Sequence, residues 1–216
     1  MIIYYNHDRK IKIERKIFKM ANNITNRLEI IGPESEILEV NLKILNKDVT
    51  EFTQKPSIDF NKIIPQPEGI YLEDLSLEDR EKHPLNWYDW NIKNWGTKWN
   101  AYNQMHNKNL FNVLYFQTAW NNVLPVIKAL SEMYSKLIFH YSFYDEDLGH
   151  NLGVFILQGG QILQQYFPSE ATQQANDLIK QIGSIYNDKL YYTIINEELN
   201  FIDRDTSNAI DIYLPY

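Results

Sequence analysis

The apolar positions near the start of the chain change their period over a short stretch. Residues 27–31 (RLEII) favour extended backbone and predict a β-strand. The Gly32-Pro33 pair predicts a turn, and residues 34–45 then place apolar side chains at helical spacing behind two glutamates in the first turn. This stretch therefore predicts a strand followed by a helix.

The second half of the chain repeats this succession. Residues 110–120 and 137–147 predict strands of aromatic and β-branched character, and the helix expected between them has Pro125 near its first turn. Two short strands are expected around Gly159-Gly160, a pair suited to a tight hairpin turn. A further helix and one or two further strands complete the chain.

The order of the predicted elements defines a fold class. A β-α unit, a long insertion and a β-α-β-β unit predict an α+β, ferredoxin-like sandwich, an antiparallel sheet with helices on one face. We predict this domain over residues 20–168, with the insertion at about residues 50–108. Residues 169–216, with Ser169 as the expected N-cap, predict a C-terminal extension packed on the same domain. Residues 1–19 predict a basic N-terminal extension or an added edge strand.

The predicted insertion is rich in tryptophan. Four of the five tryptophans of the chain lie within residues 87–99, and the fifth is Trp120. The preceding segment contains several prolines and little periodicity, which indicates a long ordered loop with one short acidic helix at residues 72–82. The tryptophan run is therefore the most distinctive local feature of the sequence.

The spacing within the tryptophan run predicts a helix that breaks. Trp87, Trp90 and Asn94 share helical spacing, and Gly96 interrupts the pattern. We therefore expect a short helix, a break at residues 95–97 and a second turn.

Charge is unevenly distributed along the chain. The sequence has 21 Lys and Arg and 28 Asp and Glu residues, and residues 1–20 hold six of the basic and two of the acidic ones. The remainder therefore holds 15 basic and 26 acidic residues. An acidic body repels phosphate backbones and lacks the counterion release that drives nucleic-acid binding. Direct contact with nucleic acid is therefore not expected.

Two compositional features bear on the environment of the protein. The chain has no cysteine, which excludes disulfides, thiolate metal sites and cysteine nucleophiles and fits a reducing compartment. It also has no apolar stretch that approaches the roughly 18 residues of a membrane span. We expect a protein of the bacterial cytoplasm with no membrane partner.

Four segments, taken in order, carry a resemblance to a known family: MANNITNRLEIIGP (20–33), IDFNKIIPQPE (58–68), WYDWNIKNWGTKWNAY (87–102) and, after FQTAW, PVIKALSEMYSKLIFHYSFYDE (125–146). These segments resemble the Api-like family, whose members are carried by phages, plasmids and other mobile elements. The similarity runs from about residue 20 to residue 165. It implies a ferredoxin-like fold and a mobile-element setting, and it brings no established activity with it.

The tryptophan run has the strongest claim to a binding site. In one interpretation its rings pack the insertion onto the sheet, with each indole N–H hydrogen-bonded to a neighbour. In the other, the rings line a surface cleft that stacks a base or a sugar or anchors a peptide. The candidate binding residues are Trp87, Trp90, Asn94, Trp95, Lys98, Trp99 and Trp120.

Two other constellations were weighed. Residues 145–147 and His150 offer oxygen and imidazole ligands for a divalent ion, but three consecutive acids point in different directions, which favours a solvated strand end. Tyr115, Tyr141 and Phe143 could stack single-stranded nucleic acid on an open sheet face, against which the acidic body argues. We expect no metal, no cofactor and no catalytic residue.

These features favour a non-enzymatic accessory protein of a mobile element that binds a host or element protein. A host defence system such as CRISPR-Cas is the expected kind of target. The alternative is a small-molecule or nucleotide binder, or an enzyme, that uses the tryptophan-rich cleft with Asp89, Asn94 and Lys98.

Overall fold

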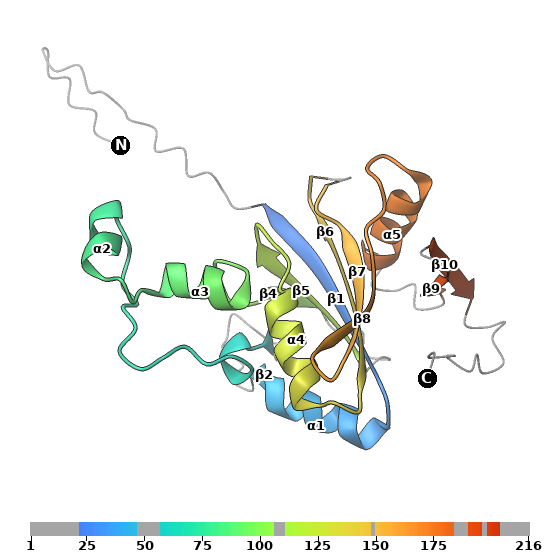
Figure 1. Ribbon diagram of the computed structural model, residues 1–216, viewed down its shortest axis with the longest axis horizontal. Helices are drawn as coiled ribbons and strands as arrows, with labels where there is room; N and C mark the ends of the chain where they lie inside the picture. Colours follow the sequence, from blue (N-terminus) through green and yellow to red (C-terminus); the bar gives the residue numbers. More distant parts are fainter. Residues whose placement is uncertain are drawn as a thin grey trace, which may run out of the picture.

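A six-stranded antiparallel sheet forms the centre of the protein (Figure 1). The computed structural model describes residues 22–46, 57–105, 111–147, 150–183, 190–195 and 198–203. The strand order is β4-β5-β1-β6-β7-β8. These strands are β1 (Asn23–Ile31), β4 (Tyr102–Met105), β5 (Val113–Ala119), β6 (Ile138–Asp145), β7 (Gly153–Gln158) and β8 (Gln161–Tyr166).

The helices and the minor elements surround this sheet. The helices are α1 (Glu34–Ile44), α2 (Leu77–Lys82), α3 (Trp87–Trp95), α4 (Leu124–Met133) and α5 (Gln173–Gly183), with a 3-10 turn η1 (Phe60–Lys62). Two further two-stranded sheets pair β2 (Leu45–Asn46) with β3 (Ser57–Ile58) and β9 (Leu190–Ile195) with β10 (Glu198–Asp203). The first β-α unit and the later β-α-β-β unit thus form as predicted.

One face of the sheet carries the main core. Alternate residues of β1, including Ile24, Leu28 and Ile30, are completely buried on this face. Val40 of α1 and Leu130 of α4 join the same apolar cluster, so both helices cover this face. The predicted ferredoxin-like sandwich is therefore confirmed, with α1 and α4 as its two helices.

The opposite face is covered in part by α5. Val154 and Ile156 of β7 pack there against Leu178 and Ile182 of α5, and Figure 1 shows α4 and α5 on opposite sides of the sheet. The extension thus covers the face that the two sandwich helices leave open. Its helix begins later than expected: the Thr172 hydroxyl accepts the Ala175 N–H at 3.2 Å and so takes the N-cap place predicted for Ser169.

The disfavoured alternative, an aromatic sheet face open to nucleic acid, does not fit the structure. Tyr115, Tyr141 and Phe143 are all buried. Tyr141 and Phe143 belong to the main core, with their ring centroids 5.7 Å apart. Rings enclosed in this way cannot stack on bases.

The insertion extends away from the sheet beyond β4 and β5, with α2 farthest out (Figure 1). Within the described residues, no helix combines the length and the apolar character that crossing a membrane requires. The strand predicted within residues 1–19 lies outside the described part of the chain, and the predicted domain boundaries at residues 20 and 168 stay predictions.

Candidate functional site

Trp95 fixes the inner end of the tryptophan run in the core. Only 2% of this residue is exposed, and its ring meets those of Phe60 and Trp90 edge to face, with centroids 5.7 and 5.6 Å away. Its indole N–H donates to the Ile64 carbonyl oxygen at 2.9 Å. Trp95 therefore packs the insertion onto the sandwich and is enclosed from any ligand.

Gly96 ends α3 and redirects the chain. Its φ of 84° lies in the left-handed region, which glycine adopts without a side-chain clash. A Cβ at this position would also lie 3.0 Å from the Asn122 carbonyl oxygen. The predicted break is confirmed, but the residues after it form bends rather than a second helical turn.

Thr97 joins the segment after the break to the end of β5. Its buried hydroxyl donates to the Ala119 carbonyl oxygen at 2.8 Å and accepts the Ala119 N–H at 3.1 Å. Because Thr97 and Ala119 are bound reciprocally, their neighbours Lys98 and Trp120 are brought side by side. Two residues that are far apart in sequence thus meet at the surface.

Lys98 lies among three aromatic rings, Tyr88, Trp99 and Trp120, referred to below as the aromatic cage. Its Nζ is 4.4 Å from the ring centroid of Trp99, 5.2 Å from that of Trp120 and 5.7 Å from that of Tyr88. All three distances are within the range of cation–π attraction. Both indoles of the cage are 41% exposed, so the cage opens to solvent.

Trp120 adopts an unusual backbone conformation to reach the cage. Its φ is 68°, a left-handed value that is rare for a bulky residue. Its N–H donates to the Asn22 carbonyl oxygen at 2.8 Å, and its own carbonyl oxygen accepts from the Asn151 amide at 3.3 Å. Contacts on both sides therefore hold this conformation.

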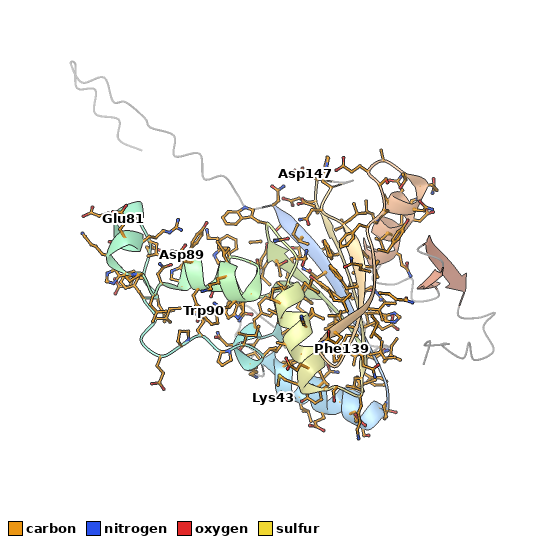
Figure 2. The ribbon with its side chains drawn as sticks, viewed as in Figure 1. Lys43, Glu81, Asp89, Trp90, Phe139 and Asp147 are labelled. Atoms are coloured by element: carbon orange, nitrogen blue, oxygen red, sulfur yellow. The ribbon has the colours of Figure 1, made fainter. Side chains whose placement is uncertain are left out.

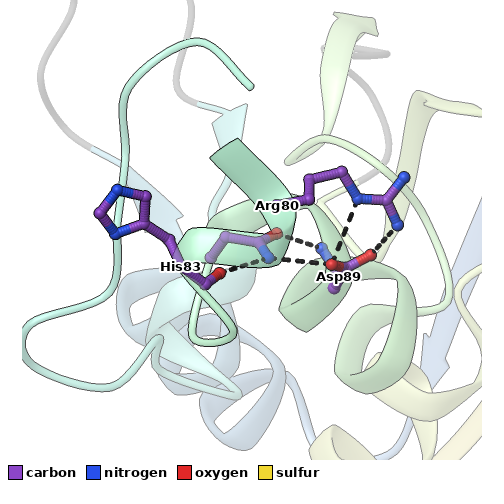
Figure 3. Close-up of polar contacts among 4 residues, drawn as sticks. Arg80, His83 and Asp89 are labelled. Atoms are coloured by element: carbon purple, nitrogen blue, oxygen red, sulfur yellow. Dashed lines mark hydrogen bonds and ion pairs between the residues drawn. The ribbon is translucent and has the colours of Figure 1, made fainter. Parts of the chain in front are cut away.

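A polar network fixes α2 against α3 behind the cage (Figure 3). Arg80 forms an ion pair with Asp89, and its guanidinium carbon lies 4.7 Å from the Tyr88 ring centroid. The buried Asn86 caps α3 by accepting the Asp89 N–H, and its amide donates to the Asp89 carboxylate and to the His83 carbonyl oxygen, each at 2.9 Å. Through Arg80, the network contacts one face of the Tyr88 ring.

The same contacts stabilise the charged forms of the ion pair. Hydrogen bonds from Arg80 and Asn86 hold the pKa of the Asp89 carboxyl below its ordinary value of 3.8, and the bond to Asp89 raises the pKa of Arg80. A carboxyl with a lowered pKa in the folded state stabilises the fold above the unfolded value. This contribution is lost as the pH falls from 3.8 through the lower folded pKa of Asp89.

Replacing Asn86 with alanine is expected to destabilise the protein by about 1–2 kcal/mol, because it removes the cap of α3 and both amide bonds. Chemical denaturation followed by circular dichroism would measure this loss. Asn86→Ser keeps a capping hydroxyl and should lose less. Equal losses for serine and alanine would show that the cap contributes nothing.

Trp90, Asn94 and Trp95 make their contacts away from the cage, whereas the Trp87 ring meets the Tyr88 ring edge to face, with centroids 5.7 Å apart. The Trp87 indole donates to the Glu73 carbonyl oxygen at 3.1 Å, and Trp90 packs against the Trp95 ring. The Asn94 amide donates to the Trp90 carbonyl oxygen at 2.8 Å. Figure 2 places Asp89 and Trp90 on α3, between the outlying α2 and the sheet. Of the predicted set, only Lys98, Trp99 and Trp120 converge.

Sequence reasoning missed the role of Arg80 and the placement of Tyr88 in the cage. Arg80 and Asp89 belong to different helices, so no helical spacing relates them. Tyr88 is not among the candidate binding residues that the sequence predicts. Its position beside Trp120, with ring centroids 6.5 Å apart, depends on the fold of the whole insertion.

The acidic strand end predicted as a possible ion site is engaged by amides. Asn22 donates to Asp147 at 2.9 Å, and Asn23 donates to Glu146 at 2.7 Å. Asp145 accepts the Asp147 N–H at 3.0 Å. Among the described residues, no group of three or more acidic or histidine side chains is arranged to hold a metal ion.

The fold defines a ferredoxin-like α+β domain to which a tryptophan-rich insertion is added. A family model described as the ferredoxin-like domain in Api92-like protein matches residues 95–204, which is half of the chain. The protein belongs to this family. The matched range includes Lys98, Trp99 and Trp120, whereas Tyr88 precedes it.

One solved structure is similar to the chain. It is the crystal structure of a protein Api92 from Yersinia pseudotuberculosis, at 15% sequence identity and a TM-score of 0.38. The match covers 56% of this chain and 43% of that one, so the chain spans less than half the length of the Yersinia protein. No curated protein matches the sequence.

Proposed function

We propose that the protein is a non-enzymatic binding factor of a phage, plasmid or other mobile element, which acts in the bacterial cytoplasm on a host protein. The observation that carries this proposal is the aromatic cage, in which two indoles and a tyrosine ring reach the surface together. Trp and Tyr dominate the binding energy of protein interfaces, and clustered rings of this kind form their centres.

The charge around the cage supports a basic surface as the target. Glu81 is exposed on α2, and Glu146 and Asp147 are exposed just beyond the end of β6. Asp147 is linked to Trp120 through Asn22, which accepts the Trp120 N–H and donates to Asp147. Exposed acidic side chains on α2 and just beyond β6 would attract a positively charged partner.

The mobile-element setting rests on the sequence resemblance to the Api-like family. Occupation of a basic surface would suit a factor that blocks a nucleic-acid-handling host defence complex such as CRISPR-Cas. Such surfaces depend on lysine and arginine to hold phosphates, and an acidic protein competes for the same side chains.

Capture from host lysate tests this proposal. The tagged full chain is compared with the double variant Trp99→Ala/Trp120→Ala, and Ile92→Ala, an exposed apolar change on α3, serves as the control. We expect the chain and the control to retain the same host proteins and the double variant to lose at least about tenfold of the recovery, as for interface hot spots. Equal recovery by all three proteins would overturn the proposal.

The same preparations examine the alternative of a small-molecule or nucleotide site. Native mass spectrometry of the purified chain would reveal a ligand carried over from expression. A bound nucleotide that disappears in the double variant would replace the protein-binding proposal with this alternative.

A further inference from the structure

The contacts of Lys98 are unusual for a surface lysine. Its ammonium lies near the three rings of the aromatic cage, and within the described residues it forms no ion pair with a carboxylate. Among the described residues, no other lysine has its ammonium over a described aromatic ring. The local geometry favours rings as the partners of this cation.

The cage has the composition of a cation-binding site. Two tryptophans and one tyrosine around an ammonium group form the arrangement by which proteins recognise cationic side chains and quaternary ammonium groups. The rings come from α3, from the segment after Gly96 and from the end of β5, so the fold assembles them. Lys98 is then the resident cation of a site that is able to hold others.

The backbone of Trp120 is independent evidence that the cage is a built site. A φ of 68° at a bulky residue costs free energy, and such conformations gather where a side chain must be aimed for function. Asn22 and Asn151 hold the residue from both sides in this conformation. A ring needed only to cover the surface would not require this support.

We propose that the aromatic cage is the recognition site for a lysine or arginine side chain of the partner, and that Lys98 is a placeholder which this side chain displaces. This inference rests on the proposed function, and it specifies the partner group that the cage would bind as a cationic side chain. The flexible stem of Lys98 can leave while the backbone stays in place, because Thr97 remains bound to Ala119. The exposed acidic residues on α2 and just beyond β6 would receive the other charges of a basic segment.

The first test measures whether the emptied cage binds a cation. Choline is titrated into the full chain and into Lys98→Ala, with the two exposed indole N–H signals followed by NMR spectroscopy. We expect Lys98→Ala to bind choline about tenfold more tightly than the unchanged chain, because the internal competitor is gone. The neutral isostere 3,3-dimethylbutan-1-ol should bind neither protein appreciably.

Two variants control this measurement. Lys93→Ala removes an exposed lysine of α3 that touches no ring in the described part of the chain, and it should behave like the unchanged protein. Lys98→Ala/Trp120→Ala should lose the added affinity. Equal affinity of Lys98→Ala for choline and for the neutral isostere would overturn the cage proposal.

The second test uses the host proteins recovered by the unchanged chain. Lys98→Ala should raise their recovery, whereas Trp99→Ala/Trp120→Ala lowers it. Lower recovery with Lys98→Ala would show that Lys98 itself contacts the partner, which would overturn the placeholder and leave the binding function intact. The opposite outcome is also informative. If choline binds but no host protein depends on Trp99 and Trp120 for its recovery, the cage is a cation site and the proposed function is wrong.

Discussion

Trp95→Ala should lower the free energy of unfolding by about 3–5 kcal/mol, the usual cost of removing a large aromatic side chain from a core. The ring is enclosed and packs against Phe60 and Trp90, and the Ile64 carbonyl oxygen loses its donor when the indole is removed. Guanidinium denaturation monitored by circular dichroism would measure the change. The attachment of α3 should also loosen, because Trp95 anchors this helix in the core.

Trp99→Ala is the matched comparison for this prediction. It removes the same side chain four positions away, from a site that is 41% exposed, and should cost less than about 1 kcal/mol. Because both variants remove a tryptophan side chain, the difference between their stability losses measures the effect of burial. Similar losses for the two variants would contradict the assignment of Trp95 to the core and Trp99 to the surface.

Tyr141→Phe should cost about 2–4 kcal/mol, because one hydroxyl serves two buried groups. The Tyr141 hydroxyl donates to the Asn26 side-chain oxygen at 2.6 Å and accepts the Val123 N–H at 2.8 Å. Removing this hydroxyl deprives the Asn26 oxygen in β1 of a donor and leaves the Val123 N–H at the start of α4 without its acceptor. Denaturation of Tyr144→Phe provides the control, since that hydroxyl forms no hydrogen bond within the described residues.

The same residue gives the protein a specific sensitivity to alkali. Burial raises the pKa of the Tyr141 phenol far above its ordinary value of 10.0, although the bond from Val123 acts in the opposite direction. Above pH 10 the unfolded chain releases this proton and the folded chain keeps it, so stability falls by about 1.4 kcal/mol for each further pH unit. In Tyr141→Phe this part of the decline should be absent. If the free energy of unfolding of Tyr141→Phe fell as steeply as that of the unchanged chain between about pH 10 and pH 11, this explanation would be contradicted.

The fold was predictable because its information is local. Local patterns specify single elements: the apolar spacing of α1, the β-forming residues of β1 and the Gly159-Gly160 turn. The order of the elements then restricts the topology to few choices. The sequence predicted helices on one face of the sheet and did not predict that α5 covers the other. The position of α5 depends on which sheet face remains open. That choice is made by tertiary packing and leaves no periodic signal.

The candidate site was predictable only in part. Sequence identified the tryptophan run and the break after Trp95, but it could not decide which rings are buried. Trp95 and Trp99 are identical in type and four positions apart, and the left-handed turn at Gly96 sends one inward and the other outward. The approach of Lys98 to Trp120 depends on the Thr97–Ala119 contact, which joins distant segments and has no local signature.

The reciprocal contact between Thr97 and Ala119 has a consequence for how association would proceed. An irregular segment usually has to be ordered when a partner arrives, and that ordering weakens the complex and slows its formation. Here the threonine hydroxyl gives the segment the rigidity of the adjoining strand. The backbone beneath the rings is therefore set at folding, and only the stem of Lys98 is left to rearrange at the moment of encounter.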